Sequence, residues 1–435
     1  EAQETLGTKD QHMKSNTVAG GVGVGGIEGS VSVYNVNSAM TEDDKALLNK
    51  DNGDFNAWVK AQSEQSNADA ALSKYDNSVA ASVKDKLAAG KAAELPGTAG
   101  KEGVAAFVGR GSSITAGDVN VKSSQNLYMD DYTGSGSASL LAGVGISVSK
   151  LNSSTSTLSE VENGSSITSS GTITVDSNVY HEHSSVVNGT SVSVVASGQA
   201  LDSAWEDNST AKAVLGDLAA VTARNLNVNA NINRVYDGHA YGGSAALLGA
   251  ISGAGIHANI GGGATAGLGN QSGSKVNSGS FEISEAASIT ATADSTLKGE
   301  GVTPSVGIFS GAGTGVCLNS DSDAKVYVGK GEKLRAEDVT LKAQVTPVAD
   351  ASAHGYSVGG VGVGTAIARI EQKDDAIVHV GEGAQLQATN EANIAANSNQ
   401  PTKGYNAYAL ATAGSAGAIN AAASSSIIEQ KKKTK

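Results

Sequence analysis

Two histidines one residue apart, His181 and His183, form the only such pair in the chain and are its first candidates for chemistry. Residues two apart on a β-strand point to the same side, so both imidazoles could bind one metal ion. Strand residues that face solvent in alternation with Tyr180 and Glu182 would give the same pattern. Because no third ligand residue is clustered beside them in sequence, we predict no metal site and no cofactor, and we keep this pair as the only candidate ligands.

Neighbouring carboxylates raise the question of calcium binding or glycan cleavage; they are Asp130-Asp131, Asp321 with Asp323, and Asp374-Asp375. Calcium-binding solenoid repeats require G-G-x-G-x-D, and no glycine phrase of this chain carries an aspartate at that place. Glycan hydrolysis requires two carboxylates set across a groove, which sequence spacing does not establish. We interpret these residues as solubility charges on turns and predict that the protein is not an enzyme, with a glycan-cleaving β-helix enzyme as the less favoured alternative.

The phrase Gly21-Val22-Gly23-Val24-Gly25-Gly26 formally matches a dinucleotide-binding fingerprint. Such a site requires a helix to follow, with its N-terminus facing the pyrophosphate. The next residues, Ser30-Val31-Ser32-Val33, alternate as a strand instead. Because related glycine phrases recur along the chain, we interpret them as corners between strands and predict neither nucleotide binding nor a catalytic residue.

A longer phrase repeats along the chain and organises it. Its clearest copies begin at Ala106 (AFVGRGSSITAGDVNV), Val326 (VYVGKGEKLRAEDVTL) and Val378 (VHVGEGAQLQA), with looser copies at residues 165–177, 221–230 and 288–293. Aligned positions recur after 54, 53 and 52 residues, from Val119 to Ile173, from Ile173 to Leu226, and from Leu334 to Leu386. We predict that these aliphatic residues stack in register from one copy to the next.

Inside these phrases the hydrophobic pattern has a period of two, which indicates strands. Residues 225–233 alternate five asparagines with four apolar residues, Leu226, Val228, Ala230 and Ile232. The Val-Gly-x-Gly step supplies the positive φ angles of a tight corner, which glycine adopts without a Cβ penalty. The pattern predicts an all-β chain folded as a right-handed parallel β-helix (a β-solenoid). Each unit of about 53 residues would hold two rungs of roughly 20 to 25 residues.

One stretch breaks this pattern. Between about residue 38 and residue 103 the glycine phrases vanish, charges cluster, and apolar residues recur at four-residue steps, which indicates helices. We therefore predict three parts: residues 1–37 as the N-terminal part of the β-solenoid, 38–103 as an α-helical insertion projecting from its side, and 104–435 as the repetitive β-solenoid. The predicted partner-binding residues are aromatic residues of the insertion: Phe55, Trp58 and Tyr75.

Composition excludes several classes of function. A net charge of -13 and a pI near 5.0 oppose nucleic-acid binding, because phosphate neutralisation requires clustered Lys and Arg. The single Cys317 excludes an intrachain disulfide and is expected to be a small buried side chain. The longest nearly uncharged stretch, residues 241–276, is too rich in Gly, Ala and Ser for a membrane helix, so we predict no transmembrane segment. The start at Glu1, without a signal segment, suggests a processed product or a fragment.

The repeated phrase V-x-V-G-x-G-x-x-L-x-A-x-D-V-x-L occurs at residues 326–341 and 106–121 and, shortened, at 378–388, and it alternates with Gly-Val-Gly-rich stretches. This combination resembles the repeat region of leukotoxin-type filamentous adhesins, relatives of filamentous haemagglutinin. The resemblance covers most of the chain except residues 38–103. It implies a virulence-associated protein of the bacterial cell surface, secreted across the outer membrane by the type V route. It also implies adhesion and, for some members, cytotoxicity, and it brings no catalytic residues.

We therefore expect a structural and adhesive module of a secreted bacterial surface protein. It would act as a stiff rod that presents binding surfaces to a protein or glycan receptor on host cells or neighbouring bacteria. End-to-end self-association is a further partner prediction, because the ends of a solenoid expose unpaired strands. The alternatives are a membrane-active leukotoxin region, suggested by the uncharged stretch from Tyr241 onward, and a self-assembling extracellular fibre subunit.

Overall fold

The described residues of the protein form a stack of parallel β-strands. The structure, a computed structural model, describes residues 2–6, 12–36, 103–217, 220–269, 279–399 and 405–431. The regular elements within these ranges are all β-strands, and the strand pairings among them are parallel. The predicted all-β class is therefore confirmed. The helices predicted for residues 38–103, and the predicted partner-binding residues Phe55, Trp58 and Tyr75, lie outside the described residues. Gly103 is the one residue of this range that the structure describes.

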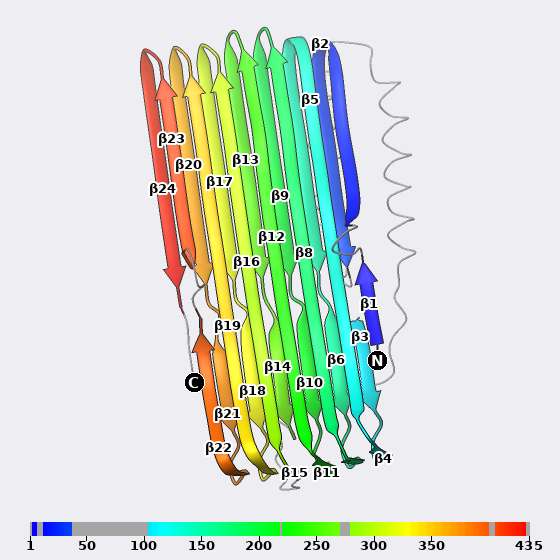
Figure 1. Cartoon of the computed structure of the whole chain (residues 1–435). Helices are drawn as coiled ribbons and strands as arrows, with labels where there is room; N and C mark the ends of the chain where they lie inside the picture. Colours follow the sequence, from blue (N-terminus) through cyan, green and yellow to red (C-terminus); the bar gives the residue numbers. More distant parts are fainter. Residues whose placement is uncertain are drawn as a thin grey trace. The chain divides into compact units, whose positions relative to one another are not determined.

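Each repeat contains four strands in a fixed order, which we call long, returning, third and short. In one repeat these are β8 (Thr172–Ser193), β9 (Ala196–Asp207), β10 (Thr210–Leu215) and β11 (Ala220–Ala223). The chain reverses direction between the long and the returning strand, at residues 194–195, and we call this reversal the tip turn. Figure 1 shows equivalent strands of successive repeats side by side in sequence order.

The remaining strands follow the same order. The long strands include β12 (Asn225–Ala246), β16 (Ala286–Val306) and β22 (Gln385–Ser398), while β19 (Lys333–Val358) joins a short strand to a long one, and β2 (Met13–Val36) and β5 (Val119–Ser153) run through the tip turn. The last long strand continues after β22 as β23 (Ala407–Ala416), which pairs with the second half of β19. The returning strands are β13 (Gly249–Ile260), β17 (Phe309–Ser320), β20 (Val361–Gln372) and β24 (Ile419–Gln430). The third strands are β3 (Gly103–Val108), β6 (Ser156–Val161), β14 (Gly263–Leu268), β18 (Asp323–Val328) and β21 (Ala376–Val380). The short strands are β4 (Ser113–Ala116), β7 (Ser166–Ser169) and β15 (Ser280–Ile283), and β1 (Ala2–Leu6) pairs with β5.

The register of the ladder is the repeat spacing of the sequence. Val119 pairs with Ile173 and Ile173 with Leu226, as their spacing predicts, and Leu334 pairs with Leu386. The prediction of two rungs per unit is wrong, because one unit spans a single step of the ladder. Its length comes from long strands such as β8, which has 22 residues against about 5 to 6 in a typical strand.

Alternation along the long strands buries the predicted aliphatic residues. Leu226, Val228, Ala230 and Ile232 are at most 1% exposed, while the asparagines between them lie on the outer face. Two clusters of apolar side chains result. The first lies between the long, third and short strands and includes Ile173, Leu215 and Phe281; the second lies between the long and returning strands and includes Trp205 and Ile256.

The glycines have two different roles. The second glycine of the Val-Gly-x-Gly step has a positive φ, 70° at Gly111 and 76° at Gly331, so this predicted corner is confirmed. The glycine phrases lie at the tip turns. In three repeats they supply the turn itself, at Gly307, at Gly359-Gly360 and at Gly417, while their other glycines lie within strands such as β2, β5 and β20. There they allow the two layers to approach, because a Cβ on Gly355 would lie 2.1 Å from the carbonyl oxygen of Thr365.

The ladder also shows where residues 37–102 are inserted. Val36 pairs with Ser153 and Gly103 with Ser156, so the two ends of this segment lie beside residues that are separated by only Ser154 and Thr155. The neighbouring repeat likewise has two residues at this step, between β9 and β10. The segment therefore interrupts the sequence of a repeat without interrupting the ladder.

We predict that Leu226→Ala destabilises the stack locally. The Leu226 side chain is fully buried and contacts the column of residues above and below it, so its truncation should cost about 2 to 5 kcal/mol. The outward-facing control Asn227→Ala should stay within about 0.5 kcal/mol. Amide hydrogen exchange in β8, β12 and β16 provides the measurement. Equal loss of protection in both variants would contradict the alternation described here.

Candidate functional site

The predicted histidine pair lies inside the stack. His181 and His183 point to the same side of β8, as their spacing predicts, but this side is the interior, and the two residues are 0% and 1% exposed. The interpretation of the pair as solvent-facing is therefore wrong. Among the described residues, no group of three or more His, Cys, Asp and Glu side chains is arranged to hold a metal ion.

His181 belongs to a buried network of charges. Its Nδ1 atom lies 2.5 Å from Oδ2 of Asp207 on the returning strand, and its Nε2 atom lies 3.2 Å from Oε1 of Gln125 on the preceding repeat. Arg234 is the ladder partner of His181 on the next repeat, and its Nε atom lies 3.3 Å from Oδ1 of Asp207. The carboxylate of Asp207 thus lies between two basic side chains. Without them, its charge would be buried in the interior without a partner.

Arg234 links three repeats through its other donors. Its guanidinium donates to the Ser322 hydroxyl at 2.8 Å and to the carbonyl oxygens of Ser209 and Gly261, both at 2.7 Å. Burial acts to raise the pKa of Asp207, but the charges of Arg234 and His181 and the hydrogen bonds from His181 and Ser209 lower it below its ordinary value. Because the side chains of His181, Asp207 and Arg234 are fully buried, a substrate has no access to them, and the network connects the returning and third strands of neighbouring repeats.

His183 has no polar partner. Both ring nitrogens lack a hydrogen bond, and the ring packs at 6.0 Å from the Trp205 ring and 5.6 Å from the Tyr236 ring, measured between centroids. Burial lowers the pKa of His183 to about 3. The imidazole therefore acts as a neutral aromatic ring in the second apolar cluster.

Strand alternation separates the two aspartates of the Asp130-Asp131 pair. Asp131 is buried and hydrogen-bonded to Ser149, whereas its neighbour Asp130 lies on the outer side next to His12. The two carboxylates of this pair therefore face opposite sides of the sheet. Cys317 is half-buried beside His257 on the outer face, so the prediction of a buried cysteine is wrong.

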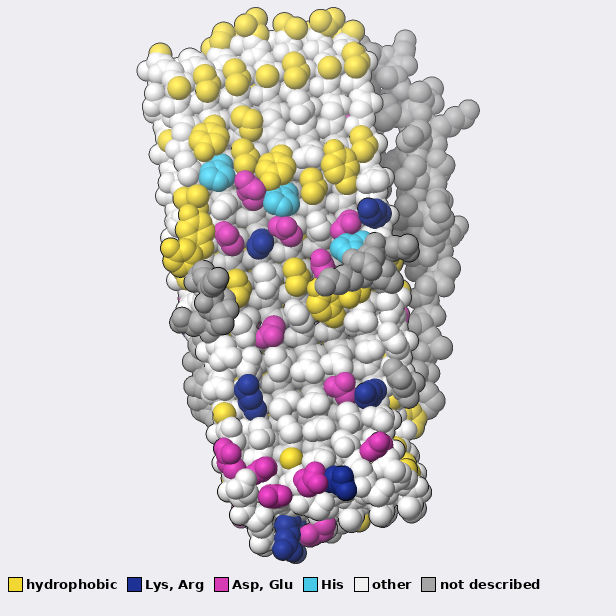
Figure 2. All heavy atoms as spheres, in the orientation of Figure 1, with side chains coloured by type: hydrophobic (Ala, Val, Ile, Leu, Met, Phe, Trp, Pro, Cys, Tyr) yellow, Lys and Arg dark blue, Asp and Glu magenta, His cyan; other side chains and the backbone are white. Residues whose placement is uncertain are grey.

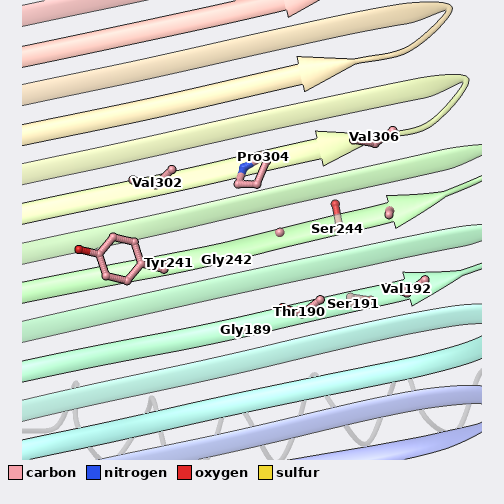
Figure 3. A pocket seen from close by; sticks show the side chains of 12 residues that line it. Gly189, Thr190, Ser191, Val192, Tyr241, Gly242, Ser244, Val302, Pro304 and Val306 are labelled. Atoms are coloured by element: carbon pink, nitrogen blue, oxygen red, sulfur yellow. The ribbon is translucent and has the colours of Figure 1, made fainter.

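A shallow groove lies on the outer face of the long strands. Its volume is about 520 Å³, and it crosses β8, β12 and β16 (Figure 3). The lining residues are almost all small or apolar: Gly189, Thr190, Ser191, Val192, Tyr241, Gly242, Gly243, Ser244, Ala245, Val302, Pro304 and Val306. Tyr241 is the titratable side chain among them, so the groove itself carries no acid and base pair.

A polar cluster borders this groove at Tyr241. The Tyr241 hydroxyl lies 2.8 Å from Nδ1 of His239 and donates to Glu300 at 2.8 Å, and Nε2 of His239 lies 3.2 Å from Asp237. Burial and the hydrogen bond to Glu300 raise the pKa of Tyr241 to about 12, and the hydrogen bond to Asp237 raises that of His239. Sequence reasoning missed the cluster, although the repeat register that makes His239 and Glu300 neighbours could have revealed it.

The cluster places a phenol hydroxyl, an imidazole and carboxylates on one sheet face at the border of the groove. Its carboxylates, Asp237 and Glu300, lie on the same face of the sheet. The neighbouring groove is lined by apolar and hydroxyl residues. A surface that combines an aromatic ring with hydrogen-bonding groups is suited to binding a glycan or a peptide. No family model, no curated protein and no solved structure matches this chain. The described residues contain no helix long and apolar enough to span a membrane.

We predict that His183 makes the protein less stable in acid. Its pKa is lowered in the folded state, so the unfolded chain takes up a proton below pH about 6.5 that the folded protein does not bind, and stability falls as the pH falls from there towards 3. Between pH 7 and pH 5, His183→Phe should therefore lose about 2 kcal/mol less stability than the unmodified protein. Urea denaturation followed by tryptophan fluorescence measures this difference.

The control for this prediction is His379→Phe, which replaces an exposed histidine in β21 and should leave the pH dependence unchanged. Parallel pH profiles for His183→Phe and the unmodified protein would refute a neutral, buried imidazole at position 183.

Proposed function

We propose that the protein is a structural and adhesive module, a stiff β-solenoid that presents binding surfaces away from a bacterial cell. The observation that carries this proposal is the continuous in-register ladder, which runs from β5 through β8, β12, β16 and β19 to β22. Each repeat fixes the position of the next through backbone hydrogen bonds along its whole length. An architecture of this kind resists bending and suits a spacer better than a catalyst.

The finer architecture belongs to the same proposal. We infer a right-handed parallel β-helix in which one repeat of about 53 residues forms one closed turn. In support, the third and short strands contribute to the same apolar cluster as the long strands, so the layers enclose a common interior. A closed turn leaves lateral edges without unpaired strands, which protects a long protein from sideways aggregation.

Secretion to the bacterial surface and adhesion to host cells or neighbouring bacteria remain proposals that rest on the repeat phrase and its resemblance to filamentous adhesins. Two features favour a binding role over a purely structural one. The segment of residues 37–102 is inserted in a repeat whose ladder does not need it. The groove beside Tyr241 combines an exposed aromatic ring with carboxylate and imidazole groups at its border.

We predict that replacing residues 37–102 by the dipeptide Ser-Thr leaves the stack folded and abolishes cell binding. The linker copies Ser154-Thr155, which make the same step in the next repeat, so the ladder between β2 and β5 should be preserved. Circular dichroism and the thermal midpoint check folding. Beads coated with the full chain or with the shortened chain are then counted on epithelial cells and on bacteria.

A second variant separates the insertion from the groove. Tyr241→Ala removes the exposed ring and keeps residues 37–102, so it tests the groove as the contact element. Equal binding by the full and shortened chains would exclude the insertion, and an absence of binding by the full chain to both cell types would contradict the adhesive function.

A further inference from the structure

The tip turns carry aliphatic residues where turn chemistry favours polar ones. Reversals of strand direction normally use Gly, Asn, Asp, Ser or Pro. Three successive repeats instead place two large apolar residues there, and a fourth has Ile308 in its turn with Phe309 directly after it. All eight are at least 36% exposed: Leu140, Leu141, Val194, Val195, Leu247, Leu248, Ile308 and Phe309. Exceptions to local rules concentrate at functional sites. We call these eight residues the tip edge.

The tip edge continues through neighbouring exposed residues. Val192, Val306 and Val358 end the long strands, and Ile251 and Val363 lie near the start of returning strands; their exposed fractions range from 45% to 68%. Figure 2 shows hydrophobic side chains in rows along the end where the strands turn back, with charged side chains only farther down the same face. The apolar surface is therefore a ridge across the repeats.

Backbone groups of the tip edge pair from one repeat to the next. The Leu247 amide donates to the Val194 carbonyl at 3.0 Å, and the Ile308 amide donates to the Leu247 carbonyl at 3.1 Å. Gly249 donates to Val195 and Phe309 to Leu248 in the same way, at 3.0 and 2.7 Å. An ordinary turn leaves such groups to solvent, and each one costs several kcal/mol in hydrocarbon if it has no partner. Here the next repeat already satisfies them.

Charge is excluded from this part of the repeats that carry the tip edge, while in the first repeat Glu28 of β2 follows the tip turn closely. Asp, Glu, Lys and Arg do not occur at residues 132–149, 183–201, 301–320 or 351–368, which surround the tip turns. The nearest charged residue of one repeat, Asp202, follows its tip turn by seven residues, or roughly 23 Å along a strand. The hydrocarbon of one membrane leaflet is about 15 Å deep, half of a 30 Å core. The tip edge could enter one leaflet without burying a charge.

Aromatic residues separate the apolar and charged zones. Tyr132, Tyr241 and Tyr356 are 37% to 40% exposed on the outer face of the long strands, between the tip turns and the charges. Tyr241 precedes the tip turn by six residues, about 20 Å, and is bonded to Glu300 on the charged side. The order aliphatic, tyrosine, charge is the order that proteins show from hydrocarbon through the interface to water.

A lipid bilayer fits this ridge better than a second protein does. The tip edge is only one tight turn wide, whereas a stable protein interface needs about 800 Å² per partner of complementary surface. A fluid leaflet closes around a narrow apolar ridge without a matching groove. The lack of charge also removes the electrostatic selectivity that protein partners commonly use.

From these observations we infer that the tip edge docks the protein on a lipid membrane by inserting Leu140, Leu247, Ile308 and their neighbours into one leaflet. This inference goes beyond the proposed adhesive module and does not depend on it. Lipid insertion draws on apolar contact, so it requires neither anionic lipid nor low salt. The long axis of the strands would stand on the membrane, with the charged zone in water.

Sedimentation with neutral phosphatidylcholine vesicles tests the inference on the full chain. The unmodified protein should sediment with the vesicles equally in 0.1 and 0.5 M NaCl. A tip variant with serine at Leu140, Leu141, Val194, Val195, Leu247 and Leu248 should partition at least tenfold more weakly. The matched control changes Phe107 and Val380, exposed apolar residues of β3 and β21, to serine and should bind like the unmodified protein.

A fluorescent label keeps the test valid if the tip variant does not fold. In a Cys317→Ser background, an environment-sensitive dye on Leu247→Cys should shift to the blue with vesicles and be quenched by lipids brominated along the chain. The same dye on Thr222→Cys of β11 should not respond. Absence of vesicle binding by the unmodified protein, or equal binding by the tip variant, would overturn the inference. So would a dimer in analytical ultracentrifugation that the tip substitutions dissociate, because a second copy would then cover the edge.

Discussion

The in-register stacking of equivalent strands is the constraint on which the rest of the structure depends. A parallel ladder places residue i of one repeat directly beside its counterpart in the next, so each position along the repeat becomes a column. Ile173, Leu226 and Leu341 lie in apolar columns, and the asparagines between such residues lie in hydrated ones. A shift of one residue would exchange every inner and outer column, which makes the register the best-determined feature of the fold.

The same constraint lets the interior change along a strand. Near the short strands the columns are aliphatic, and near the tip they are made of glycine and hydroxyl residues that bond across the two layers, as Thr303 does with Thr314 at 2.6 Å. Carboxylates enter the interior where polar groups meet them, as Asp131 does beside Ser149 and Asp207 does between His181 and Arg234. The thin, hydroxyl-lined end carries the tip turns, and its backbone is satisfied from one repeat to the next.

Sequence periodicity predicted the ladder well and the path of one repeat poorly. Spacing alone paired Val119 with Ile173, because columns preserve residue type. It did not locate the reversals at the tip, since Leu247 and Leu248 occupy a turn without any residue typical of turns. Without those reversals, the sequence could not show that Asp207 faces His181 across the interior, that a unit is one step of the ladder, or that the histidine pair is buried. The cluster of Tyr241, His239 and Glu300 was accessible only through the register.

A distance measured along the ladder tests most directly whether each repeat contributes one step to the stack. Asn120 and Asn393 are exposed and lie five ladder steps apart, through Thr174, Asn227, Ser288 and Thr340. Spin labels on Asn120→Cys and Asn393→Cys, in a Cys317→Ser background, should give a dipolar distance near 24 Å, five steps of about 4.8 Å. A distance near 48 Å, which two rungs in each repeat would produce, or a broad distribution without a maximum, would contradict the account.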